Sequence, residues 1–554
     1  MKKKLSVFLC TLMCVALAST GCSSGEAEKK ADKSGQQLAN ATVSAPKTFP
    51  IVKEKKTLKI LSTGEDFEKN EFLKWYEDYT NVHVEWELVP ATAAQEKLQV
   101  KVASSDLPDV FNNMGIGNAQ AVTYGGQGII IPLNDLIEKY GPNIKRMFEK
   151  APIAKRYAYT PDGNAYTLPM VNESTTESIP KKAWVYKPWL DKLGISMPTT
   201  LDEYYDMLVA FKTKDPNGNG KADEVPMAGA NPEKNANNEI ESFLMQSFLF
   251  YDRGTFLSMN GDKVEFDGDK PAYKEGLRYL RKLFSADLIA KDSFIQDRKA
   301  LTALTENEEN SRLGVAMAFY VGHFTVENGP KGRFKEFTTI PPLKGPDGTR
   351  RAFDRGTQVL AGKFAISRNC KIPEVAIRWV DWFYNNEEML ASGFHAGLGK
   401  EGEGWKKATA DQKGIDGRPA TYERLIPLDV KTDKHFGLKY PAYENLDFIF
   451  AQAASEATSY KEVVGSRETK EKYLPYAVNK VIPNLFYSED QLAKSGDLKT
   501  NVKKVTDTFF VKFVTGTLDI DKDWDTYVKE LKNAKVDEYV KVTQEAYDLN
   551  NKKK

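Results

Sequence analysis

Cysteine and histidine are scarce in this sequence, with four residues of each among 554. Three of the cysteines fall within the first 22 residues, so Cys370 is the only one in the remainder of the chain. We therefore expect a fold without disulfide bonds, in which Cys370 is packed rather than reactive. No two histidines have the spacing of paired zinc ligands, which argues against a catalytic zinc site.

The sequence also lacks a marked net charge and, beyond its N-terminus, any long apolar run. Its 78 basic and 77 acidic residues leave a formal charge of +1, which argues against a nucleic-acid-binding protein. No later segment approaches the roughly 20 apolar residues that a membrane-spanning helix needs. With 41% hydrophobic and 28% charged residues, the chain has the composition of a soluble protein with two or more domains.

The N-terminus combines three lysines, an apolar run from Leu5 to Ala18 and small residues before Cys22. This order is typical of a secretory signal, and the apolar run is too short to cross a bilayer. The segment before Cys22 resembles the lipobox of bacterial lipoproteins, although Ser19 stands where an aliphatic residue is more usual. We expect residues 1–21 to be removed as a signal peptide, and Cys22 to carry a lipid at the extracellular face of the cell membrane.

An ordinary cleaved signal and a buried N-terminal helix are the alternatives to this lipid anchor. Residues 22–56 are rich in Ser, Ala, Lys and Gln, so we expect them to form a flexible tether. Loss of the three N-terminal lysines would change the formal charge from +1 to −2 (1 − 3).

Apolar spacing after residue 57 predicts an α/β fold. Strands are expected near residues 58–60, 82–88 and 109–111, alternating with helices near 72–79 and 95–102. Thr200 and Glu203 form the pattern of a capping box at the start of a later helix, and the last hundred residues are mainly helical. Further strands are expected at 314–319 and 338–340, and a further helix at 375–383.

Polar side chains follow two of the predicted strands. Glu65 and Asp66 come after the first strand, and Asn112 and Asn113 come after the third. Because ligands of such sheets usually bind beyond the strand ends, these four residues are candidate ligand contacts. A solvated turn is the alternative interpretation for each of them.

The segment from Asp215 to Glu224 has oxygen-bearing side chains at positions one, three, five, nine and ten, and a glycine at position six. This pattern is typical of a calcium loop, because a hard cation needs several oxygens around one point and the glycine permits the backbone to bend. Position twelve, where an EF-hand has its glutamate, is Pro226, so we expect a shortened loop with a structural ion. The expected ligands are Asp215, Asn217, Asn219, the Lys221 carbonyl, Asp223 and Glu224. A polar turn without a metal is the alternative.

Several segments together resemble the extracellular solute-binding proteins of bacterial ABC importers for sugars. The segments that carry the resemblance are Ser105–Val110, Trp189–Ile195, Pro198–Glu203, Phe513–Gly516 and Trp524–Tyr527. Within that family the chain looks similar to large lipoproteins of Gram-positive bacteria and to alginate-binding proteins, whose similar calcium loop supports the ligands named above. The resemblance implies a hinged, two-lobed α/β fold of the type II periplasmic-binding-protein class, with an extended helical C-terminal region.

On that resemblance, residues 57–169 and 337–398 would form the first lobe, and residues 170–336 and 399–554 the second. The expected function is capture of a neutral, uronic or aminated oligosaccharide by a monomer, which delivers it to the permease subunits of an ABC importer without catalysis. Candidate cleft residues, chosen because they stand at loops or element ends, are Tyr251, His323, Phe324, Arg355 and Trp405. A surface-anchored carbohydrate hydrolase and a receptor for a membrane sensor are the alternatives, and hydrolysis would need a pair of carboxyl groups in the cleft.

Overall fold

The computed structural model describes residues 43–551, except residues 65, 232–236, 309, 328, 427–432, 438–439, 457 and 459. Within this described part, no helix has the length and apolar character to cross a membrane. The predicted signal peptide, Cys22, most of the predicted tether and Glu65 lie outside the described residues, so their predictions remain untested.

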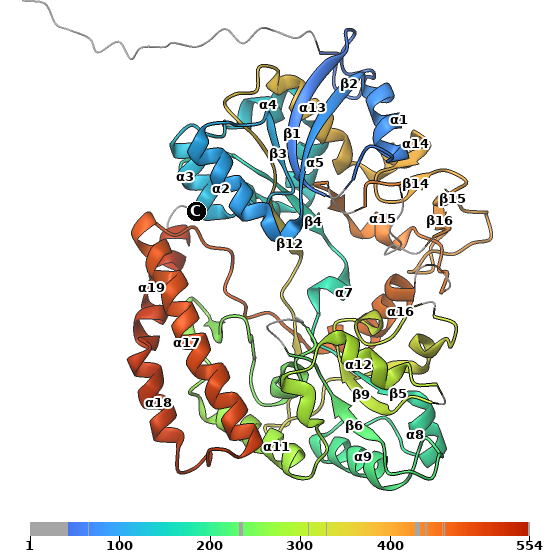
Figure 1. The fold of residues 1–554 in the computed structure, drawn as a ribbon, viewed down its shortest axis with the longest axis vertical. Coiled ribbons are helices and arrows are strands. Elements are labelled where there is room, and N and C mark those ends of the chain that lie inside the picture. Colours follow the sequence, from blue (N-terminus) through green and yellow to red (C-terminus); the bar gives the residue numbers. More distant parts are fainter. Residues whose placement is uncertain are drawn as a thin grey trace, which may run out of the picture. The chain divides into compact units, whose positions relative to one another are not determined.

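The first sheet has six strands in the order β17-β4-β12-β3-β1-β2 (Figure 1). Strands β2 and β3 both pair with β1 in parallel, as alternating strands and crossover helices predict. Strand β12 returns antiparallel between β3 and β4, and β17 joins the edge in parallel with β4. The bounds are β1 (Lys56–Thr63), β2 (Val82–Val89), β3 (Val110–Asn112), β4 (Leu168–Asn172), β12 (Gln358–Ile366) and β17 (Tyr443–Glu444).

Helices cover both faces of this sheet and create two separate apolar cores. The larger core contains a dense group of rings around Phe72, Tyr76, Trp379 and Trp382, contributed by α1 and α13 with the turn after it. The helices of this first lobe are α1 (Glu71–Thr80), α2 (Ala94–Ser104), α3 (Asn118–Gly126), α4 (Asn134–Tyr140), α5 (Pro142–Lys150), α6 (Lys155–Ala158), α13 (Pro373–Asp381), α14 (Asn386–Ala391) and α15 (Leu446–Phe450). Cys370 is buried in the same core, and burial raises the pKa of its thiol to about 12, as expected for a packed cysteine.

The second sheet has four strands in the order β10-β5-β9-β6 and forms the centre of the second lobe. The strands are β5 (Ala183–Tyr186), β6 (Val225–Ala228), β9 (Leu313–Met317) and β10 (Phe337–Ile340). The surrounding helices are α7 (Thr175–Ser178), α8 (Lys187–Leu193), α9 (Leu201–Thr213), α10 (Glu241–Leu244), α11 (Pro271–Ser285), α12 (Arg298–Thr305) and α16 (Tyr460–Glu468). Thr200 and Glu203 cap α9 reciprocally, which confirms the predicted capping box.

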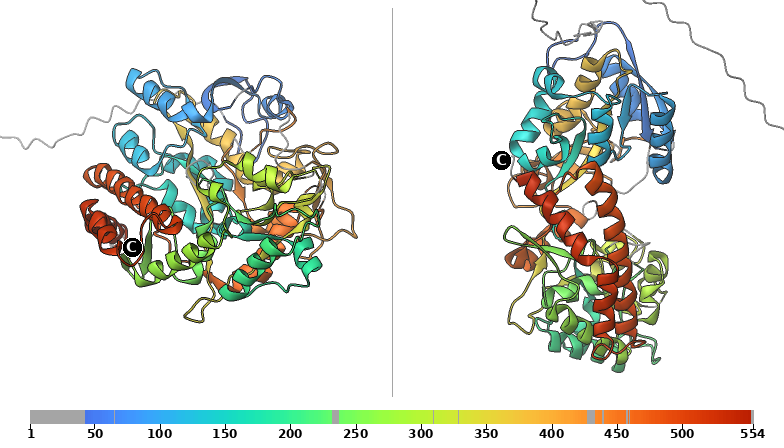
Figure 2. Two further views of the ribbon diagram at one scale, coloured as in Figure 1. Left: turned by 60° about the horizontal axis from the view of Figure 1, so that its bottom comes forward. Right: turned by 90° about the vertical axis from the view of Figure 1, so that its left-hand side faces the viewer.

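The three C-terminal helices pack side by side on the second lobe (Figures 1 and 2). They are α17 (Glu489–Thr515), α18 (Trp524–Asn533) and α19 (Val536–Asn551). Their apolar faces join the core of the second lobe through residues such as Phe513, Tyr527 and Leu531. The helical C-terminal region predicted from periodicity is therefore present.

Short two-stranded sheets complete the fold. They are β7 (Leu257–Asn260) with β8 (Lys263–Phe266), β11 (Ala352–Phe353) with β18 (Ala477–Val478), β13 (Phe394–His395) with β14 (Gly399–Lys400), and β15 (Trp405–Lys407) with β16 (Tyr422–Arg424).

The chain crosses between the two sheets three times. One crossing leads from β4 to β5 through α7, the second from β10 to β12, and the third from β17 and α15 to α16. Three connections between two α/β halves agree with the two-lobed type II fold.

Two segments lie in the lobe opposite to the predicted one. Residues 337–340 were assigned to the first lobe, but β10 pairs with β5 of the second sheet. Residues 399–554 were assigned to the second lobe, but β17 pairs with β4 of the first sheet, and Tyr440 and Tyr443 are buried in the first lobe's core. Apolar alternation indicates that a segment is a strand, but the sheet that it joins depends on long-range pairing.

Candidate functional site

A cavity of about 230 Å³ lies where the three crossings meet, and we call it the cleft cavity. The first lobe contributes the end of β4, the start of β12, and residues of β16, β17 and α15. The crossing helix α7 and helix α16 of the second lobe complete the lining. Ligands of two-lobed proteins bind at such junctions between lobes, so the cleft cavity is the candidate binding site.

One wall of the cleft cavity is aromatic. The ring of Phe448 stacks on Tyr422 with centroids 4.9 Å apart, and on His395 with centroids 5.3 Å apart. His395 is buried, and burial with the nearby Arg424 lowers its pKa to about 3. Its Nδ1 accepts a hydrogen bond from the Gly397 N–H, so the neutral ring carries its proton on Nε2, which lies 3.1 Å from the Asn386 amide oxygen. Three stacked flat rings therefore offer an uncharged surface.

Two buried side chains on this lining carry donors that lack acceptors. Nε and Nη1 of Arg424 and Nε2 of Gln452 have no hydrogen-bond partner among the residues that the structure describes. The nearest carboxylate contact of Arg424 is long, at 3.7 Å from Nη1 to Oε1 of Glu462. Buried donors are normally satisfied, and leaving one unpaired costs about 1–3 kcal/mol. A ligand oxygen in the cleft cavity would supply the missing acceptors.

Glu444 places a carboxyl group among these donors. The Glu444 residue as a whole is half-buried, but its carboxyl group is surrounded by protein. This burial raises the pKa of the carboxyl group to about 7. Arg424 opposes this rise, whereas the nearby Glu462 adds to it. Near neutral pH the protonated group can donate a hydrogen bond and the ionised group can accept one, so Glu444 suits a hydroxyl-bearing ligand.

An ion network closes the cleft cavity on the side of the second lobe. Glu177 of α7 pairs with Arg355 at 3.1 Å and with Lys461 at 3.0 Å. The ammonium of Lys461 also lies over the rings of Phe319 and Tyr320, at 4.9 and 5.3 Å from their centroids. Elements from all three crossings thus meet around a single carboxylate.

Two of the predicted contacts lie beside this cavity without lining it. Arg355 holds Glu177 in place through its guanidinium, as described above. Asn113 accepts a hydrogen bond from Lys363, a lining residue whose pKa burial lowers. Asn112 is fully buried and donates to Ser62 Oγ, so it supports the strand ends from within.

Three predicted contacts are packed inside the protein. Tyr251 and Phe324 belong to the core of the second lobe, with 1% and 0% of their surfaces exposed. Trp405 is 1% exposed, donates to the Gly399 carbonyl and packs with Tyr422 and Phe448 behind the aromatic wall. Proximity to a loop suggested exposure, but large aromatic side chains at element ends bury their rings under neighbouring segments.

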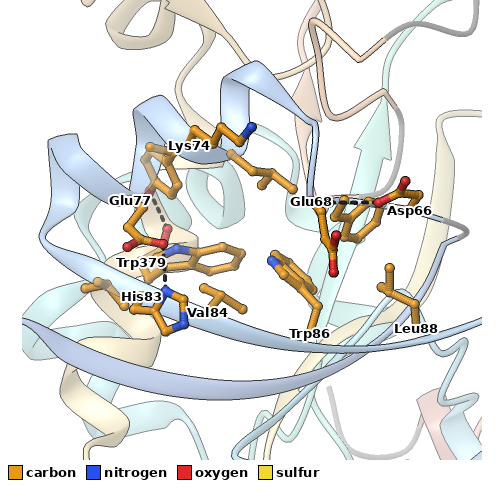
Figure 3. Close-up of a pocket in the computed structure, with 13 residues that line it drawn as sticks. Asp66, Glu68, Lys74, Glu77, His83, Val84, Trp86, Leu88 and Trp379 are labelled. Carbon is orange, nitrogen blue, oxygen red and sulfur yellow. Dashed lines mark hydrogen bonds and ion pairs between the residues drawn. The ribbon is translucent and has the colours of Figure 1, made fainter.

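His323 and Asp66 lie elsewhere. His323 contacts Arg298 at 3.1 Å and Tyr320, and burial with the positive charge of Arg298 lowers its pKa to about 3. Asp66 lines a different cavity of about 530 Å³ on the first lobe, between α1 and β2, which we call the outer groove (Figure 3).

Sequence reasoning missed the segment between Tyr422 and Glu462, which contributes the aromatic wall and the unpartnered donors of the cleft cavity. Its elements are only two to nine residues long, so no hydrophobic period could develop. The available signal was local: Tyr422 and Arg424 share one face of a short strand, and Tyr443 and Glu444 form another short strand.

The predicted calcium loop is an ordered turn after α9. The carboxylate of Asp215 accepts hydrogen bonds from the N–H groups of Gly218, Asn219 and Gly220 at 2.9–3.1 Å. Asp223 accepts from the side-chain amides of Asn217 and Asn219 and lies 3.3 Å from Arg312. Hydrogen bonds of its own backbone and side chains therefore hold the loop together.

A cation fits the chemistry of this loop. Oε1 of Glu224 is buried and has no hydrogen-bond partner within the described residues. Burial raises the pKa of Glu224, and the charges of Asp215 and Asp223 raise it further. The described residues contain no group of three or more His, Cys, Asp or Glu arranged to hold a metal, so amide and carbonyl oxygens would have to complete the ligand set.

The family model for bacterial extracellular solute-binding proteins matches residues 62–390, which is more than half of the 554-residue chain. The chain belongs to this family. The match covers most of the first sheet, all strands of the second sheet and two of the three crossings, so membership agrees with the two-lobed fold of this solute-binding protein.

A curated relative of this solute-binding protein is the fructooligosaccharide ABC transporter substrate-binding protein FusA of Streptococcus pneumoniae. It is 28% identical over 515 residues, which cover 90% of this chain and 91% of FusA. A solved structure of FusA with kestose has a TM-score of 0.72 and 26% identity, and the match covers 90% of this chain and 100% of the chain in that structure. The polygalacturonan/rhamnogalacturonan-binding protein YtcQ of Bacillus subtilis is 24% identical over 57% of this chain and 60% of its own length.

Likeness in fold extends further. A solute-binding protein of Bifidobacterium longum infantis has a TM-score of 0.75 at 19% identity, covering 90% of this chain and 99% of that structure. At this identity the likeness concerns the fold alone.

Proposed function

We propose that this solute-binding protein captures an oligosaccharide in the cleft cavity and delivers it to the permease of an ABC importer. The observation that carries the proposal is the pair of unpartnered buried donors, Arg424 Nε and Gln452 Nε2, beside the stacked rings of the same cavity. Sugars offer hydroxyl oxygens to such donors and C–H faces to aromatic rings. The ligands of the relatives support the same ligand class, because FusA is a fructooligosaccharide-binding protein and YtcQ a polygalacturonan/rhamnogalacturonan-binding protein.

The cleft cavity carries charged groups of both signs. Arg424, Lys363 and Lys461 bring positive charge, and Glu177, Glu444 and Glu462 bring negative charge. A neutral oligosaccharide would use both kinds of group as hydrogen-bond partners, whereas a uronic sugar would bind through Arg424. Both ligand types therefore belong in the test.

Delivery is proposed to depend on a lipid anchor and on lobe closure. Cys22 would hold the chain at the extracellular face of the membrane, where a loaded monomer could reach the permease subunits. Movement at the three crossings would bring Lys461 and Glu177 towards the first lobe around the ligand.

Calcium is proposed as a structural ion of the loop 215–224. A bound cation would neutralise the carboxylates of Asp215, Asp223 and Glu224 and fix the connection between α9 and β6. An EF-hand mutant of FusA has been solved, so that relative carries a loop of this general kind.

Isothermal calorimetry on the chain from Ser23 onward tests the capture of sugars. The probes are kestose, raffinose, stachyose and oligogalacturonides, each titrated into wild type, Arg424→Ala and Gln452→Met. Loss of charge-assisted hydrogen bonds should weaken binding by tenfold or more in Arg424→Ala. The matched control is Arg418→Ala, because Arg418 is exposed and pairs with Asp416 at 2.5 Å. Equal affinities for Arg424→Ala and wild type would refute the assignment of the cleft.

Hydrolysis is the second candidate function, and Glu444 is the observation that favours it. A carboxyl group with a pKa of about 7 beside a second carboxylate, Glu462, has the properties of a general acid in glycosidases. Incubation with the same oligosaccharides, followed by analysis of the products, separates the two functions. Capture requires intact sugar, whereas hydrolysis requires products that disappear in Glu444→Gln.

A further inference from the structure

The outer groove is a product of the edge position of β2. Apolar and polar side chains alternate along β2. The apolar ones, Val82, Val84, Trp86 and Leu88, face the larger core of the first lobe. Strand β2 is the last strand of its sheet, and helix α1 covers only part of its apolar face. Val82 is therefore buried, whereas Val84, Trp86 and Leu88 stay partly exposed.

The floor of this groove is formed by indole rings. Trp86 and Trp379 lie with centroids 6.2 Å apart, and Phe67 packs edge-on against Trp86 at 4.9 Å. Figure 3 shows the two indoles side by side along the groove, with Lys74 extending from α1 and Glu68 beside Trp86. Trp379 is 1% exposed, so Trp86 supplies the accessible ring.

The rim provides one free base and one free acid. The ammonium of Lys74 and the carboxylate of Glu68 have no hydrogen-bond or ion-pair partner in the described part of the chain. Glu77, in contrast, is engaged by His83 at 2.8 Å and by Lys55. Donor and acceptor groups thus stand above a partly exposed aromatic ring in a cavity of about 530 Å³, within the size range of small-ligand sites.

We propose that the outer groove is a second carbohydrate-binding site, in which a neutral sugar ring packs on Trp86 and hydrogen-bonds to Glu68 and Lys74. Asp66 and Glu68 bring two carboxylates to the groove against the single ammonium of Lys74, while Glu77 is paired with Lys55, so a uronic sugar is disfavoured. The groove lies on the first lobe and shares no lining residue with the cleft cavity. It binds sugar independently of the cleft and raises the local concentration of a long glycan near it.

Fluorine NMR of the chain from Ser23 onward, labelled with 5-fluorotryptophan, tests this site directly. The sequence has eight tryptophans, and Trp86→Phe assigns the resonance of Trp86. Stachyose and kestose should shift that resonance saturably, and oligogalacturonides should not. The shift should persist in Arg424→Ala, which separates this site from the proposed function of the cleft.

The decisive variant removes the two free rim groups, as Glu68→Ala with Lys74→Ala. Its matched control is Lys69→Ala with Glu71→Ala, which removes one exposed base and one exposed acid from the same segment without changing the lining. We expect binding at Trp86 to weaken about tenfold in the first variant and to stay unchanged in the control. Absence of a saturable shift with both neutral sugars, or equal binding by the two double variants, overturns the second site. Loss of the shift in Arg424→Ala likewise overturns its independence from the cleft.

Discussion

The ring of Phe448 stacks on that of Tyr422, with centroids 4.9 Å apart and an angle of 12° between the planes. Phe448 belongs to the five-residue helix α15 and Tyr422 to the three-residue strand β16, and both line the cleft cavity. The two residues are 26 positions apart (448 − 422), so the aromatic wall is a tertiary feature. Several expectations depend on this wall and on the charged groups around it.

Replacement of Phe448 by leucine should weaken oligosaccharide binding by about fivefold to tenfold, because a stacked ring contributes about 0.5–1.5 kcal/mol beyond its buried area. The measurement is calorimetry with the sugar that binds wild type best. Phe266→Leu is the control, because Phe266 is buried to a similar degree, 7% against 6% exposed, in hairpin β7–β8. Unchanged affinity in Phe448→Leu would exclude the wall as a ligand contact.

The raised pKa of Glu444 should make the free energy of unfolding pH-dependent. Its pKa is about 7 in the folded protein and near 4.5 in the unfolded chain, so its stabilising contribution is complete below pH 4.5 and is lost as the pH rises through 7. Relative to Glu444→Gln, wild type should lose no more than about 3 kcal/mol over this window. Urea unfolding at a series of pH values measures the difference. The control is Glu471→Gln, at an exposed position, whose unfolding free energy should change with pH as that of wild type does. The same pH dependence in Glu444→Gln would contradict the raised pKa of Glu444.

Removal of calcium should lower the melting temperature of the ligand-free protein. Calcium at about 100 times its dissociation constant stabilises a folded protein by about 2.7 kcal/mol. A chelator should therefore shift wild type downward but leave Asp215→Asn unaffected. Asp206→Asn is the matched control on α9, where Asp206 is exposed, and it should respond to the chelator as wild type does. A chelator response in Asp215→Asn equal to that of wild type would argue against an ion at this loop.

Replacement of Cys22 by serine should release the protein from the cell membrane into the medium, because the lipid needs a thiol. Fractionation of cells expressing the full chain measures the distribution. Cys370→Ser is the control, because Cys370 is buried within the first lobe. This variant should stay in the membrane fraction. Retention of Cys22→Ser in that fraction would show that another feature holds the protein there.

Much of the fold could be predicted because long elements repeat their apolar pattern many times. The alternation from Val82 to Leu88 predicted β2, and the spacing of Phe72, Trp75, Tyr76 and Tyr79 predicted α1. The capping box of Thr200 and Glu203 was recognisable because both partners lie three residues apart. These features depend on neighbours along the chain, which the sequence displays directly.

The sequence by itself determined the alternation of strands and helices, the helical C-terminal region and the polar loop 215–224. Only the tertiary structure decided which sheet β10 and β17 join, and that Tyr251, Phe324 and Trp405 are buried. It alone brought Tyr422, Arg424, Glu444 and Phe448 to one cavity, because short strands and turns encode no period and their partners lie far along the chain. Local order follows from local spacing, whereas a binding cavity arises where segments distant in sequence pack against one another.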